Sequence, residues 1–396
     1  MARKKRQKKT SSLSSVTTFA RRFSIGCVAI IVLVLVIQTI GRLGPNGDTP
    51  TSKESYPYLD ATNGYGDLPV EELETLLLDP ASNPAFALEN RFGEFPLTAN
   101  VYKVEQPRET FGAVEKAQTV AERLEFEGNF TKLSEQELEW KTPTRSLEFN
   151  KVLRKWDFSV DLINDEAALE EHVINPDLDI YITEATSLLS ELGILRVTGS
   201  SSTTKAYFMR LNGGELEQVS SPTQAQFVQV HISLKKEIVS TKEFVIIGGE
   251  RVENEKLPID GIVNKYENPL VGSAVMLLSD RAAGLDDLYG FGFTEWRTES
   301  GSEVYDIVSV DTAWERIQDG QGILRSLQSE NSGIYDEYVP LNVARFVTSQ
   351  ENVSLGFFEF NQYKEYQTPY FIFEGRAELV NGGDANFMFF VDALKR

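Results

Sequence analysis

The pattern of apolar positions separates one unbroken apolar run from later segments in which apolar and polar residues alternate. The run covers residues 23–40, eighteen positions without a charge, and is bounded by Arg22 and Arg42. As a helix it reaches about 27 Å, close to the thickness of a bilayer's hydrocarbon core. It is longer than the apolar core of a usual signal peptide, and no A-x-A-like cleavage site follows. The pattern predicts a transmembrane signal anchor.

Helical spacing of apolar residues recurs three times farther along the chain. The predicted helices lie at 111–128, at 179–194 and between about Asp311 and Gly320. In each of them apolar residues recur at intervals of three and four, which places them on one side of a helix. In the third, Asp311 is the expected N-terminal cap and Gly320 the expected stop.

Each predicted helix is followed by segments that alternate with a period of two, as on a sheet with one wet face. The last 60 or so residues alone contain four strand candidates, at 338–349, 352–363, 369–380 and 385–394. Helices segregated from antiparallel strands define the α+β class. The sequence therefore predicts an α+β fold, in which an N-terminal transmembrane helix precedes repeated helix-on-antiparallel-sheet units.

Changes in composition divide the chain into six predicted parts. They are a basic cytoplasmic tail (1–22), the signal anchor (23–40), a flexible spacer rich in Gly, Pro, Ser and Thr (41–64), an extended β-arm (65–107), a first α+β domain made of two degenerate helix-plus-strands units (108–240) and a second α+β domain (241–396).

Charge predicts the orientation in the membrane. Eight basic residues and no acidic one precede residue 23, so the positive-inside rule keeps the N-terminus in the cytoplasm. The extracytoplasmic bulk then holds 31 basic and all 59 acidic residues, a formal charge of −28. Such a surface repels nucleic acid, which is excluded as a partner.

Cysteine usage favours a bacterial cell envelope. Cys27 lies in the predicted anchor, and the "SIGC" around it resembles the lipobox at which bacterial proteins are lipidated. A lipobox cysteine ends the apolar run, whereas Cys27 lies near its beginning. We therefore favour Cys27 as a small apolar residue inside a membrane helix over a lipidated cysteine. The bulk of the chain has no cysteine, so it has no disulfide framework. Animal cell-surface domains of this size usually carry disulfides. The sequons at Asn129 and Asn352 are interpreted as chance matches.

The motifs of metal and nucleophilic chemistry are absent from the sequence. The two histidines are His172, which follows two glutamates, and His231, in a predicted strand. A cation site at His172 is an alternative to a solvated helix end, which we favour. Strand alternation places His231 on the face opposite Val230 and Ile232, where it is expected to face solvent and not a metal. There is no H-E-x-x-H, C-x-x-C, G-x-S-x-G or P-loop pattern. We therefore predict no catalytic, cofactor-binding or metal-binding residue, no cofactor and no enzymatic activity.

Carboxylate chemistry leaves one enzymatic alternative open, an envelope glycan hydrolase, because such an enzyme needs only two carboxylates in different environments. Asp286, Asp287, Glu359 and Glu365 are candidates for that pair. The aromatic-rich segment 355–375 could line a peptide groove or an exposed edge. We favour the alternative that it forms the core of a helix-covered sheet.

A family resemblance rests on the segments "VDTAWERIQDGQG", "VSLGFFEF", "PYFIFEGRAEL" and "FMFFVDAL", the last ending in Val391, Asp392 and Ala393. Together they resemble the C-terminal part of YycI/YycH-type envelope regulators, and "AVEKAQTVAERLEFEG" is similar to a PepSY-like unit. The resemblance implies a non-enzymatic protein that restrains a membrane partner such as a sensor kinase. It carries over no functional residues, because the matching positions resemble core positions.

These observations converge on one functional hypothesis. The protein is expected to be a single-pass, membrane-anchored extracytoplasmic binding or regulatory protein that acts through protein–protein contacts. Its expected partners are the lipid bilayer, through residues 23–40, and a membrane or envelope protein of unknown identity.

Overall fold

The computed structural model describes most of the chain beyond residue 59. The described ranges are 60–71, 73–92, 95–165, 168, 173–195, 202–247, 250–279, 284–294, 296–329 and 332–396, with the backbone alone for 240–247 and 250–258. The predicted tail, the signal anchor with Cys27, the spacer up to residue 59 and His172 lie outside these ranges. None of the helices within them is both long enough and apolar enough to cross a membrane.

The predicted α+β class is wrong, because the described residues are mostly β-sheet. They contain three α-helices, α2 (Ala113–Arg123), α3 (Leu178–Glu191) and α4 (Val310–Gln318), against nineteen strands. The three helices match the three helical patterns. The error came from segments such as 250–265, for which the sequence pattern predicted neither helix nor strand and which form a strand in the structure. The transmembrane helix included in that class has no counterpart among the described residues.

Most strands belong to one continuous sheet of sixteen strands, and three form a small separate sheet in the order β13-β2-β17. The strands are β1 (Ala85–Leu88), β2 (Thr98–Lys103), β3 (Thr131–Lys132), β4 (Glu137–Lys141), β5 (Arg145–Asn150), β6 (Lys155–Val160), β7 (Ser202–Asn212), β8 (Glu215–Val219), β9 (Phe227–Ile247), β10 (Glu250–Lys265), β11 (Ala274–Leu278), β12 (Leu288–Phe293), β13 (Glu303–Asp306), β14 (Ile323–Ser329), β15 (Val343–Thr348), β16 (Val353–Glu359), β17 (Tyr366–Gln367), β18 (Pro369–Leu379) and β19 (Asp384–Asp392).

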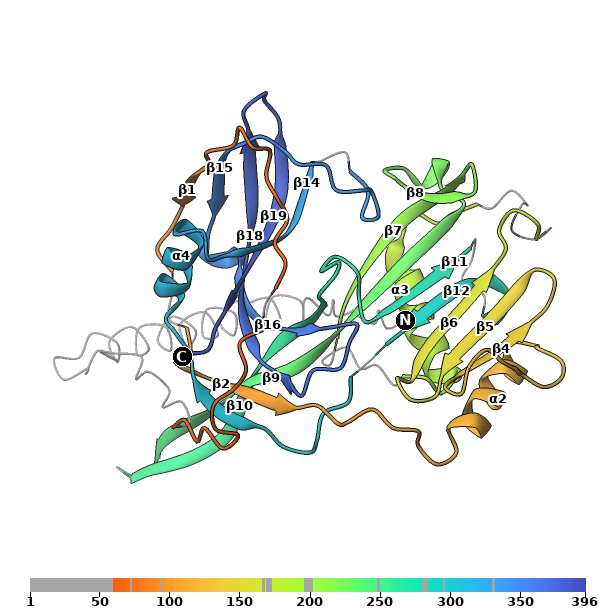
Figure 1. Cartoon of the computed structure of the whole chain (residues 1–396), viewed down its shortest axis with the longest axis horizontal. Coiled ribbons are helices and arrows are strands. Elements are labelled where there is room, and N and C mark those ends of the chain that lie inside the picture. The colour runs from red at the N-terminus through yellow and green to blue at the C-terminus, as the bar shows by residue number, and fades with distance from the viewer. Residues whose placement is uncertain are drawn as a thin grey trace, which may run out of the picture. The chain divides into compact units, whose positions relative to one another are not determined.

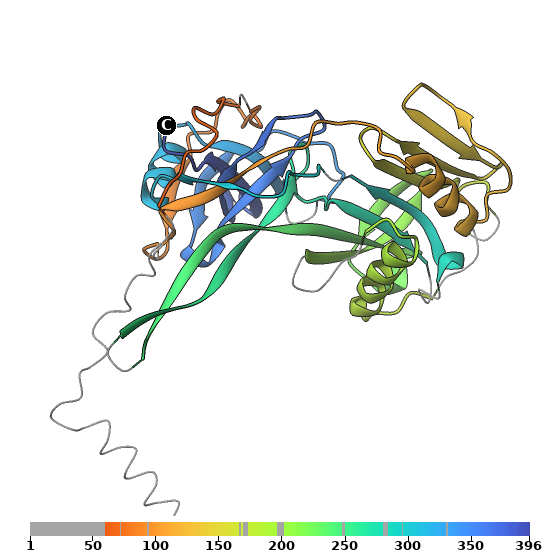
Figure 2. The same ribbon diagram turned by 90° about the horizontal axis from the view of Figure 1, so that it is seen from below.

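One section of the large sheet, which we call the first section, is antiparallel in the order β8-β7-β9-β11-β12-β6-β5-β4-β3. Figure 2 shows α2 and α3 against this section. Alternate side chains of β4, β5 and β6 are buried with the apolar sides of both helices, and Trp140, Tyr181 and Phe158 are among the largest buried groups. The period-two pattern that predicted these three strands is confirmed.

The other section, the second section, contains β1, β15, β18, β19 and β14 (Figure 1). The strand β1, from the predicted β-arm, runs parallel to β15 and completes one edge. The ring of Trp314 on α4 packs within 6.1 Å of the rings of Phe86, Phe92 and Phe373, measured between centroids. Most of the aromatic-rich segment 355–375 is therefore core, as favoured from the sequence; Phe357, Phe371 and Phe373 are fully buried.

The strands β9 and β10 form a long hairpin that both sections share (Figure 1). The N-terminal part of β9 pairs with β7 and β11, and the C-terminal part of β10 pairs with β16 in parallel. The predicted domain boundary between residues 240 and 241 falls inside β9. The long hairpin makes these two regions parts of one sheet.

The N-terminal cap of α4 is Ser309 and not Asp311. The Ser309 hydroxyl accepts a hydrogen bond from the backbone N–H of Thr312 at 3.1 Å, whereas Asp311 lies within the first turn. Gly320, with a φ of 77°, follows the end of the helix as the sequence predicted.

Replacing Ser309 with Ala is expected to lower the free energy of unfolding by about 1 kcal/mol, because the Thr312 N–H loses its acceptor. Asp311→Ala is the matched control and should cost less, since Asp311 contributes only a negative charge near the helix N-terminus. Urea denaturation of both variants measures the difference. A larger loss for Asp311→Ala would contradict the assignment of the cap.

Candidate functional site: an acidic row on the open sheet face

Three carboxylates lie side by side on the first section of the sheet. Glu139 on β4 is directly opposite Glu148 on β5, and Glu148 is directly opposite Asp157 on β6. Side chains of directly opposed residues share one face, with Cβ atoms about 4.5–5.5 Å apart. We call these three residues the acidic row. It lies on the face opposite α2 and α3, because the neighbours Leu147, Trp156 and Phe158 point into the helix-covered core.

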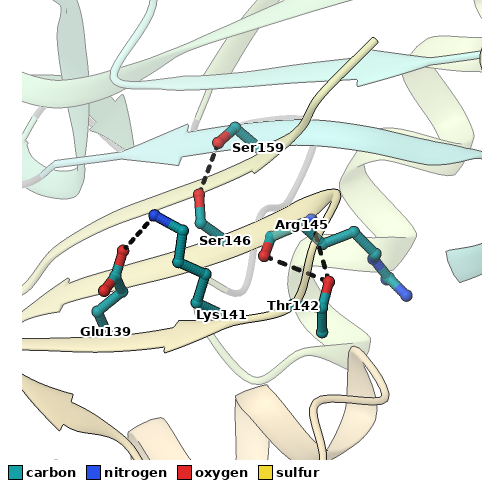
Figure 3. Close-up of polar contacts among 6 residues, drawn as sticks. All are labelled: Glu139, Lys141, Thr142, Arg145, Ser146 and Ser159. Carbon is teal, nitrogen blue, oxygen red and sulfur yellow. Dashed lines mark hydrogen bonds and ion pairs between the residues drawn. The ribbon is translucent and has the colours of Figure 1, made fainter. Parts of the chain in front are cut away.

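The face that carries the acidic row is open to solvent, and we call it the open face. Glu148, Asp157 and Ser159 are exposed, although the residues flanking them in sequence are buried or half-buried. Figure 3 shows part of this face, with Ser146 and Ser159 facing each other across β5 and β6; their hydroxyl oxygens are 3.0 Å apart. The face is polar here, and its hydroxyls can either donate or accept hydrogen bonds.

Hydrogen bonds and one ion pair hold the β4–β5 end of this face in shape (Figure 3). The Thr142 hydroxyl accepts from the backbone N–H of Arg145 at 3.1 Å and closes the turn between the strands. Lys141 Nζ lies 3.4 Å from Glu139 Oε1. The charge of Glu139 is thereby partly balanced from within the protein.

The other two carboxylates of the acidic row have no such balance. Among the described residues, no cation lies within ion-pair distance of Glu148 or Asp157. Loss of hydration around the carboxyl raises the pKa of Asp157, and the positive charge of Lys155 lowers it by less. Like charges directly opposite each other destabilise a sheet, so a cation placed above the row would relieve this repulsion.

The open face continues across the glycine-containing strand β12. Asp157 is directly opposite Gly292, and Gly292 is directly opposite Val275 on β11. A Cβ atom built at Gly292 would meet nothing within 4 Å. Gly292 thus leaves a gap between the side chains of Asp157 and Val275, where another chain can approach the backbone closely.

His231 ends this line of residues and corrects the sequence prediction. It is directly opposite Val275 on one side and Lys205 on the other, so it lies on the face opposite Val230 and Ile232 as predicted. It does not face solvent, because only 2% of its surface is exposed. The rings of Tyr207 and Tyr335 pack against it, at 5.3 and 6.3 Å between centroids.

The carboxylates considered for a glycan hydrolase come from different elements of the fold. Asp286 and Asp287 belong to a short 3₁₀ turn, where Asp287 accepts a hydrogen bond from the Ser279 hydroxyl at 3.1 Å. Glu359 is buried beside Lys265, with 2.9 Å between Oε2 and Nζ. The backbone carbonyl of Glu365, just before β17, accepts a hydrogen bond from the backbone N–H of Val104. In the described part of the chain, no group of three or more Asp, Glu, His or Cys side chains is arranged to hold a metal ion.

The acidic row was not predicted from the sequence, because none of its three residues stands out there. Each is one acidic residue in an alternating strand, like many others in this chain. The signal that could have found it is the register: the turns at 142–145 and 151–154 place residues 139, 148 and 157, each nine apart, directly opposite one another. The contribution of Gly292 could not be found in this way, since β12 follows more than a hundred residues later.

Comparison with known proteins adds little to this description. No protein-family model matches the chain, and no curated protein matches it. A solved structure of an uncharacterized protein from Eubacterium rectale is similar at a TM-score of 0.34 and 9% identity, over 81% of this chain and 91% of that chain. A likeness this low supports no conclusion about function, so the function has to be inferred from the site itself.

Proposed function

We propose that the protein is a non-catalytic binding protein that acts through protein contacts outside a cell membrane, with the open face as its contact surface and a basic polypeptide segment as its partner. The observation that carries the proposal is the acidic row, in which two exposed carboxylates without an ion-pair partner stand directly opposite each other. An exposed sheet face suits a polypeptide better than a small substrate, which is usually bound in a concave pocket.

The setting of this surface supports the same role. The chain carries a formal charge of −20, so a basic partner is attracted over a distance as well as at the contact. The apolar sequence of residues 23–40, flanked by basic residues on one side, supports attachment to a bilayer with the folded part outside the cytoplasm. The resemblance to YycI/YycH-type regulators points to the same kind of protein.

Loss of the two unpaired carboxylates is expected to weaken binding of a basic peptide about tenfold, or about 1.4 kcal/mol. The variant is Glu148→Gln with Asp157→Asn, and the probe is a nine-residue peptide of alternating Lys and Thr, titrated calorimetrically into the full chain. The affinity of the unmodified protein should fall as salt is raised, because the contact is electrostatic.

The matched control removes the same two charges elsewhere, by Glu315→Gln and Asp319→Asn on and beside α4, where both residues are exposed. It should bind the Lys-Thr peptide as the unmodified protein does. The proposal fails if control and test variants lose affinity equally, or if a peptide with Glu in place of Lys binds as tightly.

A further inference from the structure

A group of basic side chains lies on a different part of the molecule, around a small pocket of about 70 Å³. Its cations are Lys116 on α2, Arg154 in the turn before β6 and Arg297 just after β12. In a chain with a formal charge of −20, three cations around one pocket are unexpected. We call this the basic pocket.

Arg297 and Arg154 are held in place by the local backbone. Around Arg297, residues 104 and 298 form an isolated β-bridge, and the Arg297 carbonyl accepts a hydrogen bond from the Glu105 N–H at 2.8 Å. Arg154 has a φ of 54°, a left-handed conformation that is uncommon for any residue but glycine. Such conformations persist where the surrounding structure enforces them, and they are enriched at functional sites.

The charges of Lys116 and Arg297 are not balanced by ion pairs among the residues that the structure describes. Glu105 lies 3.9 Å from Arg154, which offsets part of that charge. Among the described residues, neither Lys116 nor Arg297 forms an ion pair. Burial of the ammonium lowers the pKa of Lys116, and the charges of Arg297 and Arg154 lower it further. Two cations are thus left without a counter-charge.

The inner wall of the basic pocket is apolar. Phe149, Trp156 and Phe293 line it, and each is at most 6% exposed. Thr110 adds a hydroxyl at the start of α2. A bound group would therefore meet cations and a hydroxyl on one side and aromatic rings on the other.

We propose that the basic pocket binds the phosphate group of a small organic phosphate monoester, with the ester substituent against the aromatic wall. A doubly charged oxyanion matches the two cations that lack a counter-charge, and guanidinium groups bind phosphate through paired hydrogen bonds. This site is separate from the open face, and the proposal does not depend on the function proposed for that face.

Binding can be followed through Trp156, whose ring lines the pocket. Phenyl phosphate, titrated into the full chain, is expected to change the tryptophan fluorescence saturably and to bind at least tenfold more tightly than benzoate, which carries one charge. Trp156→Phe should abolish the fluorescence change while calorimetry still detects binding.

The test variant is Lys116→Met with Arg297→Met, and it should weaken phenyl phosphate binding at least tenfold. Its matched control is Lys395→Met with Arg345→Gln, which removes two exposed cations elsewhere and should leave the affinity unchanged. Lys116→Met alone, on the exposed surface of α2, serves if the double variant does not fold. Equal binding by test and control variants would overturn the site. Binding of benzoate as tightly as phenyl phosphate would overturn the ligand class.

Discussion

Replacing Lys265 with Met is expected to lower the free energy of unfolding by about 3–5 kcal/mol, the largest single effect we predict. Lys265 Nζ lies 2.9 Å from Glu359 Oε2, and only 3% of the Glu359 side chain is exposed. The other carboxylate oxygen, Oε1, accepts a hydrogen bond from the backbone N–H of Trp296 at 2.9 Å. Without Lys265, the negative charge of Glu359 would remain buried with no cation beside it.

The loss should be largely reversed by adding Glu359→Gln to the Lys265→Met variant. The amide oxygen of Gln can keep the hydrogen bond from the Trp296 N–H, and the buried charge disappears with the carboxylate. Urea denaturation of the two single variants and the double variant measures the coupling between the residues.

Lys141→Met is the control for this cycle, since Lys141 also pairs with a glutamate but its side chain is 67% exposed. Only 14% of the Glu139 side chain is exposed, but water reaches the pair from the side of Lys141, so this variant should lose much less stability than Lys265→Met. If Lys265→Met and Lys141→Met cost the same, the buried pair does not have the stabilising role assigned to it.

Local features of the fold could be predicted from the sequence, and its class could not. The spacing of Ala117, Val120 and Ala121 identified α2 because those residues, together with Ala113, form its buried side. The class depends on how much chain is strand, and β10 shows no clear period of two that would reveal it. Its strand structure comes from pairing with β9 in the long hairpin and with β16, a strand distant in sequence that leaves no local pattern.

The same limit applies to the candidate sites. The exposure of Glu148 followed from strand alternation, but its alignment with Glu139 and Asp157 required the register of two hairpins. The basic pocket joins residues 116, 154 and 297, which only the tertiary fold brings together. Sequence reasoning placed His231 on the correct side of its strand. It could not foresee that Tyr335, about a hundred residues later, covers that side.

Acidification from pH 6.5 to pH 4 is expected to remove about 3 kcal/mol of stability through His231 alone. Burial, and to a smaller extent the charge of Lys205, lower the pKa of His231 to about 4. In the unfolded chain the imidazole has its ordinary pKa near 6.5, so between these two values the unfolded state binds a proton that the folded state does not. Stability is therefore full above pH 6.5 and falls as the pH decreases towards 4.

The hydrogen bonds of His231 explain why the folded state resists this proton. The Gly272 N–H points at Nδ1 at 3.4 Å, and Nε2 lies 3.0 Å from Gln229 Oε1. The neutral ring with its hydrogen on Nε2 satisfies both contacts. A proton on Nδ1 would place two donors against each other and leave a charge buried beneath Tyr207 and Tyr335.

The measurement compares the unmodified protein with His231→Gln by urea denaturation at pH 7, 5.5 and 4. The carboxylates titrate alike in both proteins, so their contribution cancels in the difference. At pH 7 the variant should be the less stable of the two, because it loses the packing of the ring, and its disadvantage should shrink by about 3 kcal/mol by pH 4. The chain has two histidines, so NMR titration with His172→Gln for assignment gives the pKa directly. A difference in stability that stays constant with pH, or a His231 that titrates near 6.5, would show that the ring is not enclosed as described.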